Sequence, residues 1–447
     1  DCITCKTMAV YGGKKFDIFY DSDSMPIRDQ VAELEMENIV KNYFDGYDPN
    51  EKALILQESE DRIYELLAYG IPQMQEFAEL YVSDAIRRLR IIERPKVNVG
   101  ISLKGELMEL KLTSDDISRE QLLEILAKYD RRKKFYRLRN GDFVDTTGKE
   151  IETLMELKEG LHLSEAKLKQ DVIEIPKYRA LYLDAEFNEG KSLSVTKDKD
   201  FKALLRNMKN VEDNDFDIPE NLQKVLREYQ KSGHLWIKTL QANGFGGILA
   251  DDMGLGKTLQ VISVLLSELQ VAGATDNRRV LIVCPASLVF NWYYEIEKFA
   301  PQLSAKMVIG TLSERKAILE SAGNQDILIT SYDLLKRDIE RYEEIDFHCQ
   351  IIDEAQNIKN STTRAAKAVK GISAGFKLAL TGTPIENRLS ELWSIFDYLM
   401  PGFLYSYQKF KEELESPIVQ SQDERAIKRL QKMITPFILR RLKKDVL

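Results

Sequence analysis

One short segment limits the possible folds more than any other part of the sequence. An apolar run at residues 247–250 is followed by a glycine-containing loop and by a helical pattern at 259–269. The loop reads Asp251-Asp252-Met253-Gly254-Leu255-Gly256-Lys257-Thr258. Its glycines let backbone N–H groups close on phosphate oxygens, while the lysine and threonine reach the β/γ-phosphates and a magnesium ion. The segment predicts a strand, a phosphate-binding loop and a helix, with Asp251 in place of the first glycine of the general pattern.

The alternation of strands and helices continues through the second half of the chain. Short apolar runs predict strands at 247–250, 280–284, 306–309, 327–330, 350–353 and 377–381. Helical patterns separate these runs, and strands that alternate with helices require right-handed crossovers. We therefore expect an α/β lobe with a parallel sheet that helices cover on both faces.

Two carboxylates stand at the end of one of these strands. Asp353 and Glu354 follow the predicted strand Cys349-Gln350-Ile351-Ile352, and the carboxyl ends of parallel strands form the edge where ligands of open α/β sheets bind. Asp353 is expected to hold magnesium, directly or through water, and Glu354 to polarise the attacking water. A lone acidic pair is often only an exposed strand end, but the phosphate loop upstream favours the catalytic interpretation.

Small polar residues follow the predicted strand at 377–381. Thr381, Gly382 and Thr383 are expected near the same edge of the sheet. Hydroxyl groups there would hydrogen-bond both a carboxylate network and a moving neighbour, so they are candidate sensors of hydrolysis. The alternative is a simple turn after a strand.

The first half of the sequence has a different, α+β pattern. Alternating residues at 97–103 and 107–112 predict one hairpin, and residues 135–138 and 143–144 predict a second across Asn140-Gly141. Helical patterns occupy 63–67, 75–89 and 121–129. A polar stretch at 211–220 marks the predicted domain boundary, which separates an accessory region at 1–217 from a second domain at 218–447.

Composition limits the cellular compartment and the binding partners that are expected for this chain. The 72 acidic and 64 basic residues give a net charge of −8, so overall charge does not support nucleic-acid binding, and the basic cluster at 425–444 is more typical of a solvated helix face. Four cysteines in 447 residues favour a reducing, cytoplasmic compartment. No apolar run approaches the ~18 residues of a membrane-spanning helix, so no membrane partner is expected. Cys2 and Cys5 have the spacing of half a zinc site, but no second pair of ligands is near them in sequence, so zinc is not expected.

Taken in order, these elements resemble the first motor lobe of a helicase-superfamily-two ATPase of the SWI/SNF type, a double-stranded-DNA translocase. The resemblance covers about residues 222–447. Residues 226–230 resemble the adenine-recognition motif, with Gln230 as the base reader, and 251–260 resemble motif I. Residues 353–356 resemble motif II, with Gln356 where many relatives carry histidine, and 380–387 resemble motif III.

Two further motifs lie at the carboxyl ends of predicted strands. Residues 283–288 are similar to motif Ia and residues 329–332 to motif Ib. In the family these edges touch the backbone of a DNA strand, so the candidate phosphate contacts are Pro285, Ser287, Thr330 and Ser331. Residues 400–447 resemble a helical protrusion with the exit towards a second lobe, and the first half looks like the accessory region of bacterial members.

The resemblance implies a RecA-like P-loop lobe that uses ATP and magnesium. The implied nucleotide-binding residues are Gln230, Asp252, Met253, Gly254, Leu255, Gly256, Lys257 and Thr258. The implied catalytic residues are Lys257, Asp353 and Glu354, with Thr258 and Asp353 on the magnesium. The implied coupling residues are Gln356, Thr381, Gly382 and Thr383. The implied activity is ATP hydrolysis coupled to movement on duplex DNA. The implied contacts are with the DNA backbone and not with the bases.

The family's second RecA-like lobe carries motifs IV to VI and the arginine fingers, and it does not occur within the 447 residues. The chain also begins at Asp1 without a methionine, which favours a piece of a longer protein. An arginine finger contributes ~10³ to 10⁵ in rate. We therefore expect these residues alone to bind ATP–magnesium weakly and to turn it over very slowly.

Two other interpretations stay open. In the first, the lobe is a nucleotide-gated protein- or DNA-binding module without translocation, and residues 1–217 dock a protein partner. In the second, the motor acts on RNA. The presence of Lys257, Asp353 and Glu354 favours an enzyme, because a protein without catalytic activity would not need Glu354. A bacterial host would place the protein in the cytoplasm, in association with the nucleoid.

Overall fold

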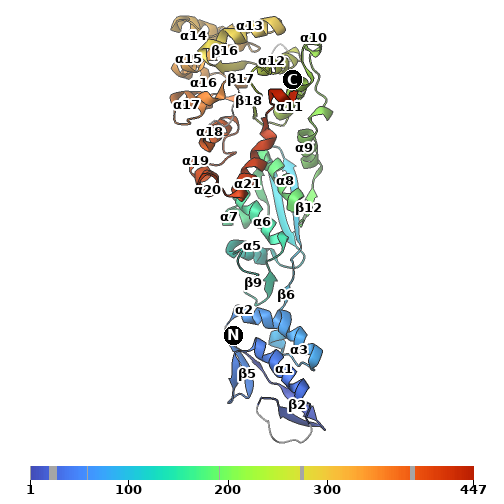
Figure 1. Cartoon of the computed structure of the whole chain (residues 1–447). Coiled ribbons are helices and arrows are strands. Elements are labelled where there is room, and N and C mark those ends of the chain that lie inside the picture. The colour runs from blue at the N-terminus through green and yellow to red at the C-terminus, as the bar shows by residue number, and fades with distance from the viewer. Residues whose placement is uncertain are drawn as a thin grey trace. The chain divides into compact units, whose positions relative to one another are not determined.

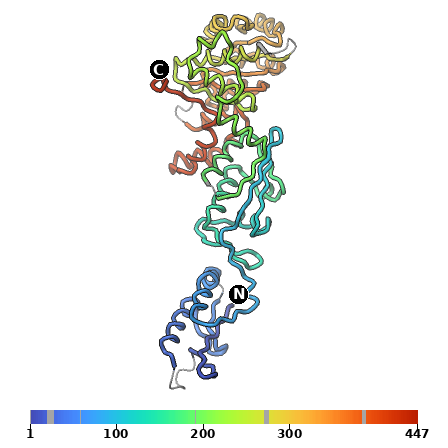
Figure 2. Tube along the Cα trace, turned by 90° about the vertical axis from the view of Figure 1, so that its right-hand side faces the viewer, coloured from blue at the N-terminus to red at the C-terminus, as the bar shows by residue number. Residues whose placement is uncertain are grey.

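The computed structural model describes residues 2–19, 28–57, 59–190, 192–271, 276–382 and 388–446, with the backbone alone at 190, 270 and 271. The chain folds into two compact units, whose trace can be followed in Figures 1 and 2. The first unit comprises Asp1–Val99, Lys111–Ile173 and Gly190–Val195, and the second comprises Gly100–Leu110, Glu174–Glu189 and Thr196–Leu447. Neither unit is therefore one continuous stretch of sequence.

The first unit has a hydrophobic core of its own. An antiparallel sheet has the order β1 (Cys2–Cys5), β5 (Ala53–Gln57) and β4 (Gly46–Asp48). The helices of the same core are α1 (Gln30–Tyr43), α2 (Glu60–Glu65) and α3 (Ile71–Phe77). Val40 and Leu56 are fully buried there, and Ile63 is nearly so. The unit also contains a small hairpin of β2 (Met8–Tyr11) and β3 (Lys14–Asp17), which follows β1 in the sequence. Its other helices include α5 (Arg119–Lys128), α6 (Lys149–Gly160) and α7 (Glu165–Leu168).

Both predicted hairpins of the first half are confirmed. The first is formed by β7 (Val97–Lys104) and β8 (Leu107–Ser114), which are neighbours in a four-stranded sheet of order β11-β8-β7-β12. That sheet is completed by β11 (Ile173–Pro176) and β12 (Ser194–Lys197). In the second hairpin β9 (Phe135–Arg137) pairs antiparallel with β10 (Phe143–Asp145), and β6 (Ile91–Ile92) joins β10 in parallel. Gly141 has a φ of +95°, which explains the Asn-Gly turn.

The predicted helix at 75–89 is wrong. Helix α3 ends at Phe77, Ala78 has an extended backbone, and a separate short helix, α4 (Asp84–Arg87), begins after Ser83. Tyr81, within the predicted helix, is 82% exposed, so no core holds the intervening residues in a helical conformation. The helices predicted at 63–67 and 121–129 are confirmed by α2 with the π-turn that follows it and by α5.

A seven-stranded parallel sheet forms the centre of the second unit, in the order β15-β16-β14-β17-β18-β13-β19. Its strands are β13 (Gly247–Leu249), β14 (Val280–Cys284), β15 (Ala305–Met307), β16 (Ile327–Ser331), β17 (Phe347–Ile352), β18 (Ala374–Leu380) and β19 (Ile438–Leu439). All five residues of β14 are buried, as in parallel sheets that helices cover on both faces. The six predicted strands are confirmed, and β19 is an additional strand that the sequence patterns did not reveal.

Helices connect and flank these strands. Before and between the strands lie α8 (Ala180–Gly190), α9 (Lys199–Lys209), α10 (Glu220–Gln223), α11 (Glu228–Ala242), α12 (Lys257–Val271), α13 (Val289–Phe299), α14 (Leu312–Glu320), α15 (Tyr332–Arg337), α16 (Ile339–Glu343) and α17 (Arg364–Gly371). After β18 come α18 (Leu389–Leu399), α19 (Tyr407–Phe410), α20 (Ser416–Ser421), α21 (Glu424–Ile434) and α22 (Lys443–Val446). Among the described helices, none has the length and apolar character needed to cross a membrane.

Helix α8 and the turn before it pack on the helices that follow β18. The guanidinium of Arg179 donates to the carbonyl of Phe403 at 2.5 Å. Lys432 on α21 forms ion pairs of 2.9 Å with Glu186 and Glu189 on α8. Residues 174–189 therefore belong to the same compact unit as the parallel sheet, although they lie before residue 218 in the sequence.

Candidate nucleotide site

The loop between β13 and α12 has a backbone that only glycine adopts easily. Gly254 and Gly256 have φ values of +83° and +73°, in the left-handed region that penalises other residues. A Cβ on Gly256 would also lie 2.5 Å from the Nε2 atom of Gln230. Leu255 between them is fully buried and anchors the loop to the lobe. The loop ends at Lys257, the first residue of α12, so the positive end of a helix dipole faces the loop.

The predicted adenine-recognition segment lies directly against this loop. Gln230 donates from Nε2 to the carbonyl of Leu255 at 3.1 Å, and its Oε1 accepts from the backbone N–H of Arg227 at 2.9 Å. The hydroxyl of Tyr229 donates to the same Leu255 carbonyl at 3.1 Å. The segment and the loop are thus one hydrogen-bonded assembly, while contact of Gln230 with a base stays a prediction.

The lysine of the loop is held by the loop itself. Lys257 donates from Nζ to the backbone carbonyl of Asp251 at 2.7 Å. Thr258, the next residue, is half-buried in the first turn of α12. A polyphosphate in the loop would therefore compete with the Asp251 carbonyl for the Lys257 ammonium group.

Asp353 ends β17 in a nearly closed setting and is 8% exposed. One carboxylate oxygen accepts from Trp292 Nε1 at 2.9 Å, and the other accepts from the backbone N–H of Glu354 at 2.8 Å. Burial raises the pKa of the Asp353 carboxyl, while the Trp292 hydrogen bond and the charge of Lys257 oppose the rise. Carboxylate and hydroxyl oxygens are the hard donors that magnesium prefers, so Asp353 and Thr258 stay the predicted ligands.

Glu354, Gln356 and Thr381 form a chain of hydrogen bonds. Gln356 donates from Nε2 to the Glu354 carboxylate at 2.6 Å and accepts from the Thr381 hydroxyl at 3.1 Å. The glutamine therefore makes the link between the residues after β17 and those after β18. Gly382 lies beside the phosphate loop, because a Cβ added to it would be 3.5 Å from Met253 Cγ. Thr383 lies outside the described residues.

The four candidate DNA contacts divide into two pairs. Ser287 is exposed and Pro285 is half-buried, directly after β14. Thr330 is fully buried and donates to the Val308 carbonyl at 3.2 Å. Ser331 is 4% exposed and caps α15 by accepting from the N–H of Leu334. The hydroxyl groups of Thr330 and Ser331 thus serve the fold. Ser287 is exposed and has a hydroxyl group that can donate to a phosphate, whereas Pro285 has no N–H to donate. A phosphate contact of any of the four residues stays a prediction.

Three residues that organise the site were not among those predicted from the sequence. Trp292 and Tyr332 hold Asp353: the indole binds its carboxylate, and the Tyr332 hydroxyl donates to its backbone carbonyl at 2.7 Å. Arg441 binds the fully buried carboxylate of Asp251 with Nε at 2.9 Å from Oδ1 and a second contact to Oδ2. The only signal in the sequence was Asp251 itself, because a buried carboxylate in place of a glycine requires a cationic partner.

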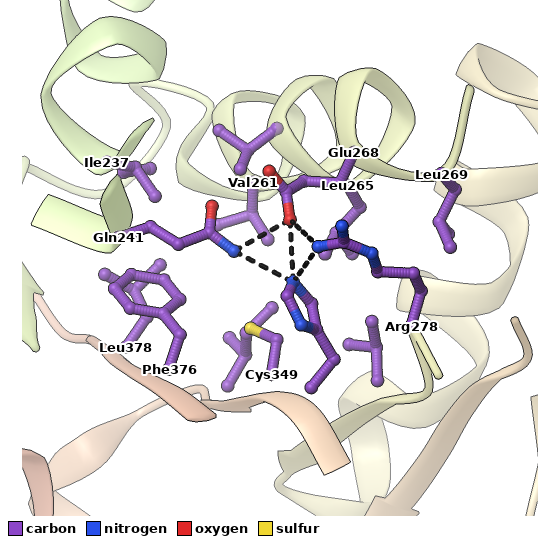
Figure 3. Close-up of a pocket in the computed structure, with 14 residues that line it drawn as sticks. Ile237, Gln241, Val261, Leu265, Glu268, Leu269, Arg278, Cys349, Phe376 and Leu378 are labelled. Carbon is purple, nitrogen blue, oxygen red and sulfur yellow. Dashed lines mark hydrogen bonds and ion pairs between the residues drawn. The ribbon is translucent and has the colours of Figure 1, made fainter. Parts of the chain in front are cut away.

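Figure 3 shows a second polar cluster, which includes Gln241, Glu268 and Arg278. His348 Nε2 lies 2.7 Å from Glu268 Oε2, and Gln241 Nε2 donates to the same oxygen at 2.8 Å. Arg278 Nη1 lies 3.1 Å from His348 Nε2. Because His348 is the second residue of β17 whereas Asp353 follows the last, this cluster is remote from the phosphate loop and ties α11 and α12 to the sheet.

The Cys2 and Cys5 pair is unsuited to sharing one metal ion. Both residues lie on β1, and residues three positions apart in a strand point to opposite faces. Within the ranges that the structure describes, no cluster of three or more potential ligands is present.

Two family models together match nearly the whole chain. Residues 1–219 match the model described as bacterial SNF2 helicase associated, and residues 229–447 match the SNF2-related domain.

Several known proteins match part of the chain. An uncharacterized ATP-dependent helicase of Mycoplasma genitalium is 43% identical over 259 residues, which are 58% of this chain and 24% of that protein. The TATA-binding protein-associated factor mot1 of Schizosaccharomyces pombe is 37% identical over 274 residues, which are 57% of this chain and 14% of that protein. The solved SWI2/SNF2 ATPase core of Sulfolobus solfataricus in complex with dsDNA is 43% identical, with a TM-score of 0.46, over 51% of this chain and 47% of that one. The chain thus spans less than a quarter of the length of the two curated relatives.

Proposed function

We propose, from the premise that this chain joins a bacterial SNF2 helicase-associated domain to an SNF2-related domain, that its protein hydrolyses ATP to move along double-stranded DNA. One observation carries the proposal: the phosphate loop, the two carboxylates and Thr381 follow β13, β17 and β18. These strands are parallel neighbours in the sheet, so their carboxyl ends share one edge. Such an edge is where open α/β sheets bind nucleotides.

The residues at this edge suit a magnesium–nucleotide. The N–H groups of the glycine loop and the Lys257 ammonium would bind the phosphates, after Lys257 leaves the Asp251 carbonyl. Thr258 and Asp353 would hold magnesium, which supplies neutralising charge at the β- and γ-phosphates when bound. Trp292 keeps one oxygen of Asp353 fixed and leaves the residue ready to act as an oxygen ligand.

Glu354 would orient and polarise the attacking water. Its carboxylate is positioned by Gln356, and Gln356 is positioned by Thr381. A shift of the segment after β18 would therefore move the catalytic carboxylate through two hydrogen bonds. This supports a coupling role for Gln356 and Thr381, in which the state of the nucleotide and the position of a bound strand affect each other.

The DNA-binding part of the proposal rests on the edge after β14. Ser287 is exposed there and Pro285 is half-buried, in a segment that resembles the family's strand-contacting motif. Contacts of this kind grip phosphates and carry no sequence information. We therefore expect binding that depends on salt and on the presence of a duplex, with little preference for sequence.

The test is steady-state ATP hydrolysis by a polypeptide of these 447 residues, with and without duplex DNA, beside Glu354→Gln as the blank. We expect turnover at the level of the blank, because an arginine finger worth ~10³ to 10⁵ in rate is not among these residues. Magnesium–ATP binding should persist in the blank and disappear in Lys257→Ala. Clear DNA-stimulated turnover would contradict the low activity, and binding that survives Lys257→Ala would contradict the nucleotide site.

A second candidate function is a nucleotide-gated binding module. It is favoured by the contacts of α8 with α21, because they attach part of the accessory sequence to the lobe that binds nucleotide. A longer form with a second lobe separates the two functions: a motor shows hydrolysis that duplex DNA stimulates, whereas a module does not. Replacing duplex DNA with duplex RNA in the same assay tests the RNA-directed alternative.

A further inference from the structure

The chain returns to the phosphate loop at residues 438–443, which we call the C-terminal strap. Its first two residues form β19, parallel to β13. Beyond the strands the pairing continues along the loop: the N–H of Ala250 donates to the Leu439 carbonyl at 2.7 Å, and that of Asp252 donates to the Arg441 carbonyl at 3.0 Å. The strap therefore runs beside the first residues of the loop.

Arg441 joins this strap to three parts of the nucleotide site. Its guanidinium forms the ion pair with Asp251 at the start of the loop, and Nη2 donates to Gln260 on α12 at 2.7 Å. Nη1 donates to the backbone carbonyl of Tyr229, beside the predicted base reader Gln230. The Arg441 side chain is only 14% exposed and the Asp251 side chain is fully buried. Arg441 thus holds Asp251 in place, and the backbone carbonyl of Asp251 accepts the hydrogen bond from Lys257.

Lys443 brings a second positive charge to the loop. Its backbone N–H donates to Asp252 Oδ2 at 3.0 Å, which fixes the start of the side chain. Its ammonium group lies beside Gly254, because a Cβ on that glycine would be 3.5 Å from Lys443 Nζ. The residue is exposed, and in the described part of the chain it forms no salt bridge. A flexible ammonium group at the rim of a phosphate-binding loop is suited to contact an oxyanion.

We propose that the C-terminal strap is part of the nucleotide site, with Lys443 contacting the terminal phosphates and Arg441 positioning the loop. The inference rests on the proposed function, because it requires a nucleotide in the loop. The proposal gives the C-terminal strap, which follows the predicted helical protrusion, a direct role in nucleotide binding. The sequence pattern alone treated this segment as a basic exit from the lobe.

The Lys443 contact is tested by equilibrium binding of magnesium–ATP, magnesium–ADP and adenosine to the 447-residue chain. We expect Lys443→Gln to weaken ATP binding about tenfold, the loss of one charged hydrogen bond, with a smaller effect on ADP and none on adenosine. Lys444→Gln removes the same charge one residue later and should change ATP affinity less than about twofold. Equal affinities for the two variants would overturn the role of Lys443.

Lys257→Ala distinguishes this failure from failure of the proposed function. If the unaltered chain does not bind ATP, or binds it equally well after Lys257→Ala, the proposed nucleotide site is wrong. If Lys257→Ala abolishes binding while Lys443→Gln has no effect, only the strap inference is wrong.

The positioning role of Arg441 needs a readout that general destabilisation does not move. Arg441→Lys keeps the charge but loses the planar fork that reaches three partners, so we expect ATP affinity to fall about tenfold. Lys432→Met removes a similarly buried ion pair from α21 and should lower the melting temperature while leaving ATP affinity within about twofold. If Arg441→Lys does not fold, Gln260→Met, which removes one Arg441 partner, should weaken ATP binding in the same direction. ATP affinity equal to that of the unaltered chain would refute the role.

Discussion

Glu354 is in a backbone conformation that a glutamate rarely adopts. Its φ and ψ angles are 50° and 58°, in the left-handed region, which costs a residue with a side chain about 1–3 kcal/mol. The residue lies between the β17 strand end and a short 3₁₀ turn, and its N–H binds the Asp353 carboxylate. Strain of this kind concentrates at functional sites, and here it directs the proposed catalytic carboxylate towards Gln356.

This strain reverses the usual effect of glycine at residue 354. We expect Glu354→Gly to be more stable than Glu354→Ala by about 1 kcal/mol, because only glycine adopts the left-handed conformation without cost. Denaturant unfolding of the two variants gives the difference. At Asn357, inside the 3₁₀ turn, the order should be the ordinary one, with alanine more stable than glycine. A Glu354→Ala variant at least as stable as Glu354→Gly would show that the backbone is not strained.

The hydrogen bond from Trp292 favours the ionised form of the Asp353 carboxyl. Burial raises the pKa of this carboxyl, and the indole N–H opposes the rise by binding the ionised form. The proposed magnesium ligand must be ionised, so we expect metal-dependent binding to be lost as the pH falls through the raised pKa. Trp292→Phe removes a hydrogen bond to a charged group, worth about 1.5–3 kcal/mol, so the midpoint of this loss should move to higher pH.

The pH dependence of magnesium-dependent ATP binding measures this effect. Tyr332→Phe is the matched control, since it removes a hydrogen bond to the Asp353 backbone and leaves the carboxylate contacts in place. A midpoint that does not move in Trp292→Phe, or that moves equally in both variants, would exclude the indole from this role.

At the scale of residues, the sequence predicted the site residues whose positions follow from the order of strand, loop and helix. Lys257, Asp353 and Glu354 each follow a buried strand, so their shared edge follows from parallel topology. Arg441 could not be assigned to Asp251 in this way, because 190 residues separate them and β19 is two residues long. A strand this short carries no periodic pattern.

At the scale of elements, the Glu268 cluster joins two helices to one strand. Burial opposes ionisation of Glu268, but hydrogen bonds from His348 on β17 and Lys238 on α11 outweigh it and lower the pKa of Glu268 to about 2. A folded pKa below the ordinary 4.5 means that this group stabilises the fold above about pH 4.5. The contribution is lost as the pH falls from there towards about 2.

Glu268→Gln should therefore destabilise the second unit by about 1–3 kcal/mol at neutral pH, a range that allows for partial screening by solvent. The difference from the unaltered chain should shrink as the pH falls below about 4.5. Denaturant unfolding across this range checks both statements. Glu228→Gln makes the same change on α11, at a side chain that is 89% exposed, and should stay within about 0.5 kcal/mol of the unaltered chain. A difference for Glu268→Gln that is independent of pH would contradict the ionic origin.

Element types were easier to predict from the sequence than element ends. Six of the seven strands of the parallel sheet are apolar runs between helices, and all six were predicted, whereas the two-residue β19 was not. The helix predicted at 75–89 was wrong because periodicity reports apolar spacing and not whether a core is present, as the exposed Tyr81 shows. The hydrogen bonds of Gln356 with Glu354 and Thr381 depended on side-chain directions after two strands, which spacing in the sequence does not encode.

At the scale of the whole molecule, the compact units do not follow the order of the sequence. The second unit includes Glu174–Glu189, which lies within the match to the bacterial SNF2 helicase associated model. Arg179 is 4% exposed, and its guanidinium lies 4.5 Å from the centre of the Tyr405 ring. Lys432 has its two carboxylate partners on α8. The lobe therefore depends on residues that precede all of its motifs.

Two truncations test this dependence. A chain of residues 218–447 keeps every motif but loses Arg179 and α8, and we expect it to melt at least ~5 °C below a chain of residues 174–447. Lys432→Met in the longer of the two should reproduce part of the decrease. Thermal unfolding followed by circular dichroism makes the comparison. Equal melting temperatures would mean that α8 contributes nothing to the lobe.

Asp251 and Arg441 are far apart in the sequence, so they are synthesised at different times. A ribosome adds ~5–20 residues per second, so about 10–40 s pass between the carboxylate and its guanidinium partner. Until then β13 has no neighbour on its β19 side, and burial of an unpaired Asp251 is unfavourable. We therefore expect the phosphate loop to be among the last parts of the lobe to mature, and a nascent chain to gain the proposed nucleotide binding only after nearly the whole lobe has been translated.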